Sequence, residues 1–190
     1  MSPTRQQIIE KTSELLEHQG YHGTGLNQIV AESETPRGSL YYYFPGGKEE
    51  LAAEAMEYRA GQMSDYVRHQ LALYRDPVEA IYRTLLGFAE QSEGHGCTGG
   101  APIAAVALET AASSERLRRS CELAYHLLTG PFQEELIAGG YLTARAASLA
   151  LTIEAALEGA MILSRTQKSA APLRTVAEEI RTLLIAAAPP

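Results

Sequence analysis

The sequence has few cysteines and no excess of positive charge, and each of these shortages excludes a class of protein. Cys97 and Cys121 are too few and too far apart to suggest a framework of disulfides. The formal net charge is −7, from 16 Lys and Arg against 23 Asp and Glu, which argues against a general nucleic-acid binder because such proteins are usually basic. No basic and apolar leader opens the chain. We therefore expect a cytoplasmic protein.

Enzyme and metal-site motifs are also missing. No nucleophile with a neighbouring base, no phosphate-binding loop and no carboxylate pair stands out. His95 and Cys97, in the glycine-rich segment GHGCTGG, could begin a metal or redox site. Two ligands without a matching pair fall short of a zinc pattern, so a flexible surface loop is the favoured interpretation. We predict no enzymatic activity, no catalytic residues, no metal site and no cofactor.

One apolar run, from Ala144 to Leu163, has the length of a membrane span. Arg145, Glu154 and Glu158 interrupt it at a cost that a bilayer does not readily tolerate. We therefore interpret this run as a buried helix and predict no contact with a membrane.

Helical periodicity is present almost throughout the chain, without alternating strand runs. With 190 residues the chain is long enough for a buried core. The pattern predicts an all-α fold of about nine helices, with a kink at Gly130-Pro131. After the N-terminal region, helices are expected over residues 48–75, 77–91, 115–138, 143–167 and 172–187, and APIAAVALETAA follows the glycine-rich break.

Residues 24–51, TGLNQIVAESETPRGSLYYYFPGGKEEL, have the layout of a DNA-reading helix-turn-helix. Thr24 is expected to cap a first short helix over residues 26–33. Thr35 is expected to cap a second helix over residues 36–43, whose first position is a proline that needs no N–H there.

The second helix is too short to be stable alone, so it must be held by packing. Leu40 and Phe44, four residues apart, are the expected anchors. Arg37, Ser39 and Tyr42 or Tyr43 would then face outward. Gly38 lies beside them and lets the backbone approach a bulky partner such as a major groove.

The next helix has Lys48 in its first turn, on the unfavourable side of the helix dipole. A phosphate would reverse the sign of that interaction, because helical N–H groups and a lysine together bind anions. The alternative is that Glu49 and Glu50 already offset Lys48 on a solvated surface.

Gly38, Leu40, Tyr41 and Phe44 form a Gly-x-Leu-Tyr-x-x-Phe motif. With this motif, residues 4–52 resemble the N-terminal DNA-binding domain of the TetR family of bacterial transcriptional repressors. The segment FPGGKEELAAEA further resembles a branch typified by lincomycin-resistance and related multidrug repressors.

The chain departs from the family pattern in the turn, where Glu34 replaces the usual glycine. A left-handed backbone at a non-glycine residue costs about 1 to 2 kcal/mol, so the turn is expected to be strained or reshaped.

The resemblance implies a three-helix DNA-binding domain, residues 1–47, and a larger helical ligand-binding and dimerisation domain, residues 48–190. A dimer would present two reading helices about 34 to 36 Å apart to a near-palindromic operator. A small, lipophilic effector in the larger domain would release the repressor from double-stranded DNA. The alternative function is a non-enzymatic helical adaptor that binds proteins.

Arg37 is the best candidate for a base contact, because its fork can bond guanine. Asn27 and Gln28 suit either bases or phosphates, and Tyr41 is the tyrosine expected to be partly buried. The predicted DNA-binding residues are Thr24, Asn27, Gln28, Arg37, Gly38, Ser39, Tyr41, Tyr42, Tyr43 and Lys48.

Apolar residues on the helix over residues 143–167 form two stripes, more than one core can cover, which implies a homodimer. Leu151, Ala155 and Ile162 form one stripe. The other stripe and the last helix supply the predicted interface, which consists of Leu149, Ile153, Ala156, Ala160, Val176, Ile180 and Leu184. The alternative is a last helix that packs only on its own domain.

The resemblance also implies an effector cavity, for which we select large apolar or amphipathic groups of the middle helices. These are Tyr66, Phe88, Ile103, Tyr125, Leu128, Phe132, Leu157 and Met161. The alternative for each is ordinary core. Glu109, on an otherwise apolar segment, is expected to meet either a polar group of the ligand or a neighbouring arginine.

Overall fold

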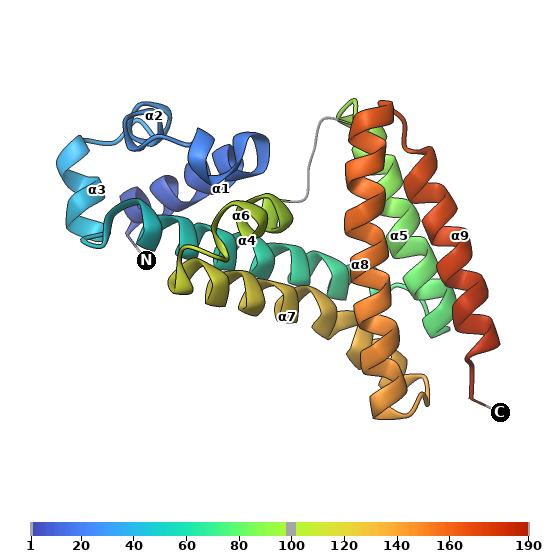
Figure 1. Cartoon of the computed structure of the whole chain (residues 1–190). Coiled ribbons are helices and arrows are strands. Elements are labelled where there is room, and N and C mark those ends of the chain that lie inside the picture. Colours follow the sequence, from blue (N-terminus) through green and yellow to red (C-terminus); the bar gives the residue numbers. More distant parts are fainter. Residues whose placement is uncertain (1, 98–101, 190) are drawn as a thin grey trace. The chain divides into compact units, whose positions relative to one another are not determined.

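The computed structural model describes residues 2–97 and 102–189, and over these ranges the chain contains helices and no strands (Figure 1). This confirms the predicted all-α fold. The helices of the described residues are α1 (Pro3–Gly23), α2 (Leu26–Glu32), α3 (Arg37–Tyr43), α4 (Gly47–Leu71), α5 (Pro77–Gly94), α6 (Pro102–Thr110), α7 (Glu115–Ala138), α8 (Thr143–Gln167) and α9 (Ala171–Ala186).

The chain folds into two compact units, which we describe separately. Unit 1 contains Met1–Gln62 and Ala101–Tyr125, and unit 2 contains Met63–Gly100 and His126–Pro190. The long helices α4 and α7 each contribute residues to both units. The predicted ranges 1–47 and 48–190 separate a DNA-binding domain from a ligand-binding and dimerisation domain. The two compact units are defined by packing alone, so their bounds need not coincide with these ranges.

In unit 1, α1 carries the apolar face that holds the other helices. Ile8, Ile9, Leu15 and Leu16 are at most 6% exposed, as their helical spacing predicts. The side chain of Ser2 caps the helix by accepting from the amide of Arg5. Helix α6 packs along α1, and α2 and α3 also contact it, so α1 is the base on which the short helices are assembled.

Gly20 forms a break inside α1. Gly20 has a φ of 71° and a ψ of −175°, after which the helix resumes and continues to Gly23. A Cβ at Gly20 would lie 2.1 Å from Oε1 of Glu109, which is closer than any real contact. Glycine is therefore required here by the backbone, and a Cβ would in addition displace the carboxylate of Glu109.

Gly20→Ala should accordingly lower the free energy of unfolding by about 1 to 3 kcal/mol, from left-handed strain and the clash with Glu109. Urea unfolding measures this change. Gly61→Ala is the control, because a Cβ there meets nothing within 4 Å and alanine favours a helix interior. Adding Glu109→Ala should remove the clash and leave the strain. A Gly20→Ala protein as stable as the wild type would contradict the packing described.

Unit 2 is held by α5, α8 and α9, of which α9 packs on both of the others. Asp76 caps α5 by accepting from the amide of Glu79 at 2.8 Å. Helix α7 passes through Pro131 and ends before Gly140, whose φ is 89°. The hydroxyl of Tyr141 donates to the carbonyl of Leu184 at 2.9 Å and so ties the turn before α8 to α9.

Glu154 of α8 is buried, with 6% of its surface exposed. Burial, together with a smaller effect from the charge of Glu158, raises the pKa of its carboxyl from 4.5 to about 7. The pKa of Glu154 is higher in the folded protein than in the unfolded chain. Between pH 4.5 and about pH 7, the folded protein therefore keeps the proton on Glu154, whereas the unfolded chain releases it. This stabilisation is present at low pH and is lost as the pH rises through 7.

We therefore expect the free energy of unfolding to fall by up to about 3 kcal/mol between pH 5 and pH 8 through Glu154. Glu154→Gln should remove this slope and raise the stability at pH 8. Glu90→Gln changes an exposed glutamate of α5 and should leave the slope in place. Denaturant unfolding at a series of pH values makes the comparison, and an unchanged slope in Glu154→Gln would contradict it.

Helix α8 is long and apolar enough to cross a membrane by length and composition, although a core helix of a soluble protein meets the same test. Only 39% of its most apolar window is buried. The prediction of a buried helix is thus correct for one face only, and the other face is exposed.

Candidate DNA-binding site

The first helix of the predicted helix-turn-helix begins without the expected threonine cap. The N-cap residue of α2 is Gly25, and no side chain bonds to its free amides. Thr24 is fully buried and its hydroxyl donates to the carbonyl of Gly20 at 2.7 Å. The prediction that Thr24 caps α2 is therefore wrong, because Thr24 instead bonds across the break in α1, and its burial removes the hydroxyl from the surface predicted to bind DNA.

The turn between α2 and α3 has the left-handed backbone expected from its sequence. Glu34 has a φ of 51°, as predicted for a residue that replaces a glycine. Thr35 does not cap α3, since its hydroxyl lies 2.8 Å from the hydroxyl of Ser33 and is buried. Pro36 occupies the N-cap position instead, and α3 begins at Arg37.

Helix α3 is held by the two predicted anchors. Leu40 is 1% exposed and Phe44 is fully buried. Arg37 and Gly38 are exposed, and Ser39 is half-buried. A Cβ on Gly38 would meet nothing within 4 Å, so no packing inside the chain requires a glycine there. The seven residues of α3 thus present their polar side to solvent and their apolar side to the core of unit 1.

The three tyrosines of α3 have different environments. Tyr42 is 79% exposed and Tyr41 is 49% exposed, so the expectation that Tyr41 is the partly buried tyrosine is wrong. Tyr43 is half-buried, and its hydroxyl accepts from the hydroxyl of Ser2 at 2.9 Å. The rings of Tyr42 and Tyr43 are packed edge to face. Because a phenolic hydroxyl can accept one bond and donate another, Tyr43 keeps a proton for an outside acceptor.

On α2, Asn27 is exposed, whereas the amide of Gln28 is bonded on both sides. Gln28 accepts from the amide of Gln19 at 2.7 Å and donates to the carboxylate of Glu32 at 2.8 Å. Of this predicted pair, Asn27 is the residue whose side chain is available to a partner.

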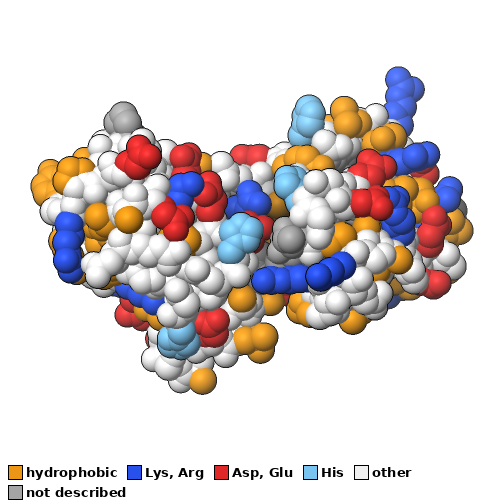
Figure 2. Space-filling model, turned by 90° about the horizontal axis from the view of Figure 1, so that it is seen from above, with side chains coloured by type: hydrophobic (Ala, Val, Ile, Leu, Met, Phe, Trp, Pro, Cys, Tyr) orange, Lys and Arg blue, Asp and Glu red, His pale blue; other side chains and the backbone are white. Residues whose placement is uncertain are grey.

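Positive charge is scarce around α3. Arg5 is paired with Glu54 and lies over the ring of Phe44, and Lys11 is paired with Glu14. Arg37 is exposed and forms no ion pair with any described residue. In Figure 2, basic and acidic side chains are interspersed over the visible face rather than gathered in one basic patch.

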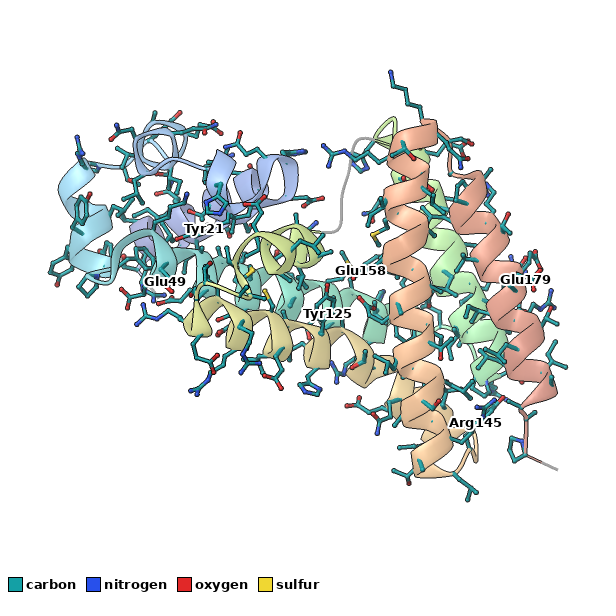
Figure 3. The ribbon with its side chains drawn as sticks, in the orientation of Figure 1. Tyr21, Glu49, Tyr125, Arg145, Glu158 and Glu179 are labelled. Carbon is teal, nitrogen blue, oxygen red and sulfur yellow. The ribbon has the colours of Figure 1, made fainter. Side chains whose placement is uncertain are left out.

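Lys48 lies against an aromatic ring instead of extending into solvent. Its Nζ is 4.2 Å from the centroid of the Tyr21 ring, a cation–π distance. Burial lowers the pKa of Lys48, and the charge of Glu109 partly offsets this effect. Figure 3 shows Tyr21 on α1 and Glu49 at the start of α4 in this region. The predicted alternatives for Lys48 did not include this packing.

Glu109, at the end of α6, forms no ion pair with an arginine among the described residues, in contrast to one of its two expected contacts. Its carboxylate accepts from the backbone amide of His22 at 2.7 Å, just after the break at Gly20. No sequence pattern predicts this contact, because the residues are 87 positions apart and one partner is a backbone group.

The residues selected for an effector cavity are divided between the two units. Ile103 and Tyr125 belong to unit 1 and the others to unit 2. Phe88, Phe132 and Leu157 are at most 5% exposed and lie in the hydrophobic core, with Tyr66 and Met161 packed against it. Leu128 is half-buried. Core burial agrees with the alternative stated for these residues, and their role in a cavity stays a prediction.

Two hollows in unit 1 differ from the expected cavity. One, bordered by Leu16, Met56 and Ile103, has a volume of about 10 Å³, the space of one water. The other has about 240 Å³ and a polar border that includes Glu10, Glu14 and Glu17. Neither suits a lipophilic molecule of drug size, which needs a mostly apolar pocket of about 300 Å³ or more.

The structure corrects the choice of the dimer stripe on α8. Leu149, Ile153, Ala160, Ile180 and Leu184 are at most 4% exposed, because α8 and α9 bury them within unit 2. Ala156 and Val176 are half-buried against the same core. The apolar residues left exposed on α8 are those of the other stripe, with Leu151 at 65% and Ile162 at 47%.

A short exposed reading helix on buried anchors, followed by a larger helical body, is the arrangement of a helix-turn-helix transcriptional regulator. Residues 8–55 match the bacterial regulatory proteins of the tetR family. Residues 77–179 match the C-terminal domain of LmrA/YxaF-like transcriptional regulators. The chain belongs to the TetR family of transcriptional regulators, which are DNA-binding proteins and not enzymes.

Curated relatives agree with this assignment over nearly the whole chain. The uncharacterized HTH-type transcriptional regulator YxaF of Bacillus subtilis is 39% identical over 181 residues, which is 95% of each chain. The HTH-type transcriptional regulator LmrA of the same organism is 39% identical over 188 residues, 95% of this chain and 96% of the relative. The predicted resemblance to the lincomycin-resistance branch is thereby confirmed. The HTH-type transcriptional repressor NemR of Escherichia coli is 27% identical over 63% of this chain and 60% of its own.

Solved structures share the fold. A TetR transcriptional regulator from Legionella pneumophila superposes with a TM-score of 0.82 at 18% identity, covering 96% of this chain and 98% of the other. The reduced form of NemR from E. coli gives a TM-score of 0.79 at 18% identity, covering 94% and 96%.

Proposed function

We propose that this protein is a cytoplasmic repressor that binds a near-palindromic operator as a homodimer and is released by a small, lipophilic effector. The observation that carries the proposal is the exposed polar side of α3. Arg37 stands there without an ion pair or hydrogen bond to the described residues, and the packing around Gly38 does not require a glycine. Both features suit a helix that enters a major groove, where Arg37 bonds guanine and the backbone approaches the duplex.

The remaining DNA contacts follow from the same surface. Asn27, Ser39 and Tyr42 are available to bases or phosphates, and Tyr41 and Tyr43 offer hydroxyls to the phosphate backbone. Thr24 is not part of the interface, because it is buried. Few cations serve this surface, so we expect moderate affinity with a modest dependence on salt.

The dimer interface in this proposal is the exposed face of α8. Leu151, Ile162 and Leu163 are between 47 and 65% exposed, and Ala155 and Gly159 on the same face let another helix approach closely. Ile185 of α9 is 61% exposed. A two-fold pairing of these faces into a four-helix bundle would cover the apolar surface and place two α3 helices on one operator.

Repression is supported by a relative of this chain. NemR, a relative over part of the chain, is described as a repressor. We propose that the effector enters unit 2 near the predicted aromatic residues Tyr66 and Phe88, whose rings lie edge to face with centroids 5.9 Å apart. A coupling of about 1 to 3 kcal/mol between the effector and the operator would suffice.

Selection of bound duplexes from a random pool tests the function. The expected product is one near-palindromic motif with half-sites about one helical turn apart. Repeating the binding measurement against a panel of lipophilic compounds should find one that releases the operator. Failure to enrich any motif would refute the proposal that the protein is a repressor. Enrichment of a motif whose binding no compound reverses would refute the proposal that a lipophilic effector releases it.

A further inference from the structure

We propose that Arg116, in the first turn of α7 and outside the helix-turn-helix, binds the phosphate backbone of the operator beside α3. This inference rests on the proposed function, because it names a further residue of the same DNA surface. Arg116 is exposed and forms no hydrogen bond or ion pair with the described residues.

The position of Arg116 is fixed by contacts between the starts of α4 and α7, both in unit 1. The side chain of Ser114 donates to the carboxylate of Glu49 and also accepts from the amide of Leu117, so it caps α7 and ties it to α4. Two turns later, Ser120 donates to Glu57 at 2.9 Å. Figure 3 shows Glu49 at this place, beside the first turns of α7.

The guanidinium of Arg116 reaches the segment that follows α3. Its Nη1 lies 2.8 Å from the place where a Cβ of Gly46 would stand, and Gly46 is the third residue after the end of α3. The φ of Gly46 is not positive, so its backbone does not demand a glycine. Because Gly46 has no side chain, the guanidinium of Arg116 can occupy the space beside its Cα.

Other groups at this place are poorly suited to hold a phosphate. The Nζ of Lys48 lies over the ring of Tyr21. The amide of Gly46 donates to the carboxylate of Glu50 at 2.6 Å, and the amide of Gly47 donates to the carbonyl of Phe44 at 2.9 Å. When α3 occupies a major groove, the DNA backbone beside that groove would therefore meet the available cation Arg116. Its planar guanidinium can donate two parallel hydrogen bonds to one phosphate.

Arg116→Ala tests the proposal through the dependence of operator binding on salt. Each lost phosphate contact lowers the slope of log affinity against log salt by about 0.9, so a dimer should lose about 1.8. Affinity at 0.1 M salt should fall on the order of 10- to 60-fold, equally for the operator and for its base-substituted versions. Arg116→Lys keeps the charge and should retain most of the slope.

Arg119→Ala is the matched control. Arg119 lies one turn further along α7, its side chain is 73% exposed and paired with Glu115, and its loss changes the net charge equally. It should leave the slope unchanged, because the charge of Arg119 is already offset by its ion pair with Glu115, whereas Arg116 has no such pair with the described residues. Thermal unfolding of each variant should match the wild type, since both side chains are exposed.

Two outcomes would overturn the proposal. An unchanged slope in Arg116→Ala would mean that Arg116 only offsets the charge of the nearby Glu50. Equal losses in Arg116→Ala and Arg119→Ala would mean a general effect of net charge. A wild-type protein that selects no operator is a different result, which refutes the proposed function instead.

Discussion

Arg37→Ala should abolish much of the sequence preference of the protein while leaving its fold intact. Arg37 is the exposed cation of α3 and forms no ion pair within the part of the chain that the structure describes, and a bidentate bond from arginine to guanine contributes about 1 to 3 kcal/mol of discrimination. In a dimer both half-sites lose this bond, so the affinity for the selected operator should fall on the order of 30-fold to more than 1,000-fold. Affinity for unrelated duplex should change far less.

Fluorescence anisotropy with the selected operator and with a base-substituted duplex measures both affinities. Arg119→Ala removes an equal charge from α7 and should keep the preference. The unfolding midpoint should not move, because Arg37 forms no ion pair with the described residues. If Arg37→Ala kept the wild-type ratio between the two duplexes, Arg37 would not be a base reader.

Leu151→Glu should convert the protein from a dimer into a monomer and thereby remove operator binding. Leu151 is 65% exposed in the middle of the apolar face of α8, so a charge there costs the single chain little. At the centre of a two-fold interface the same charge would be buried twice, opposite its own copy, without a partner. Loss of the second reading helix should weaken operator binding on the order of 100-fold or more.

Sedimentation equilibrium and light scattering give the mass directly, and anisotropy gives the operator affinity. Leu108→Glu is the control, since Leu108 is 87% exposed but lies on α6 in unit 1. It should remain dimeric. A dimeric Leu151→Glu protein would place the interface elsewhere, and a monomeric one that kept full operator affinity would refute the need for two reading helices.

The order and ends of most helices could be predicted from local chemistry. Proline and aspartate mark the start of α5, and glycines mark the end of α7. The anchors Leu40 and Phe44 followed from a spacing of four residues. Such signals act within one or two helical turns, so they can be interpreted without knowledge of the rest of the fold.

Threonine caps were predicted by the same local rules and failed. Both Thr24 and Thr35 are buried, and their hydroxyls bond to groups four and two residues earlier in the chain instead of capping the helices that follow. The preference of threonine for helix caps is weak, and a buried hydroxyl bonds to another nearby group when that group is closer than the amides of the helix.

The choice between the two stripes of α8 was beyond the reach of periodicity. A helical pattern gives the angle between apolar stripes but does not name the neighbour that covers each one. Packing of α9 decided that Leu149 and Ile153 form the core and that Leu151 stays exposed.

By itself, then, the sequence determined the helical class, the helix-turn-helix motif and the outward position of Arg37, because all three depend on residues close together in the chain. The tertiary structure alone decided which cations near the DNA surface are available. Lys48 is covered by Tyr21, and Arg116 is brought beside Gly46 from 70 residues away in the sequence (116 − 46). Contacts over such separations depend on how whole helices pack, and no local pattern encodes them.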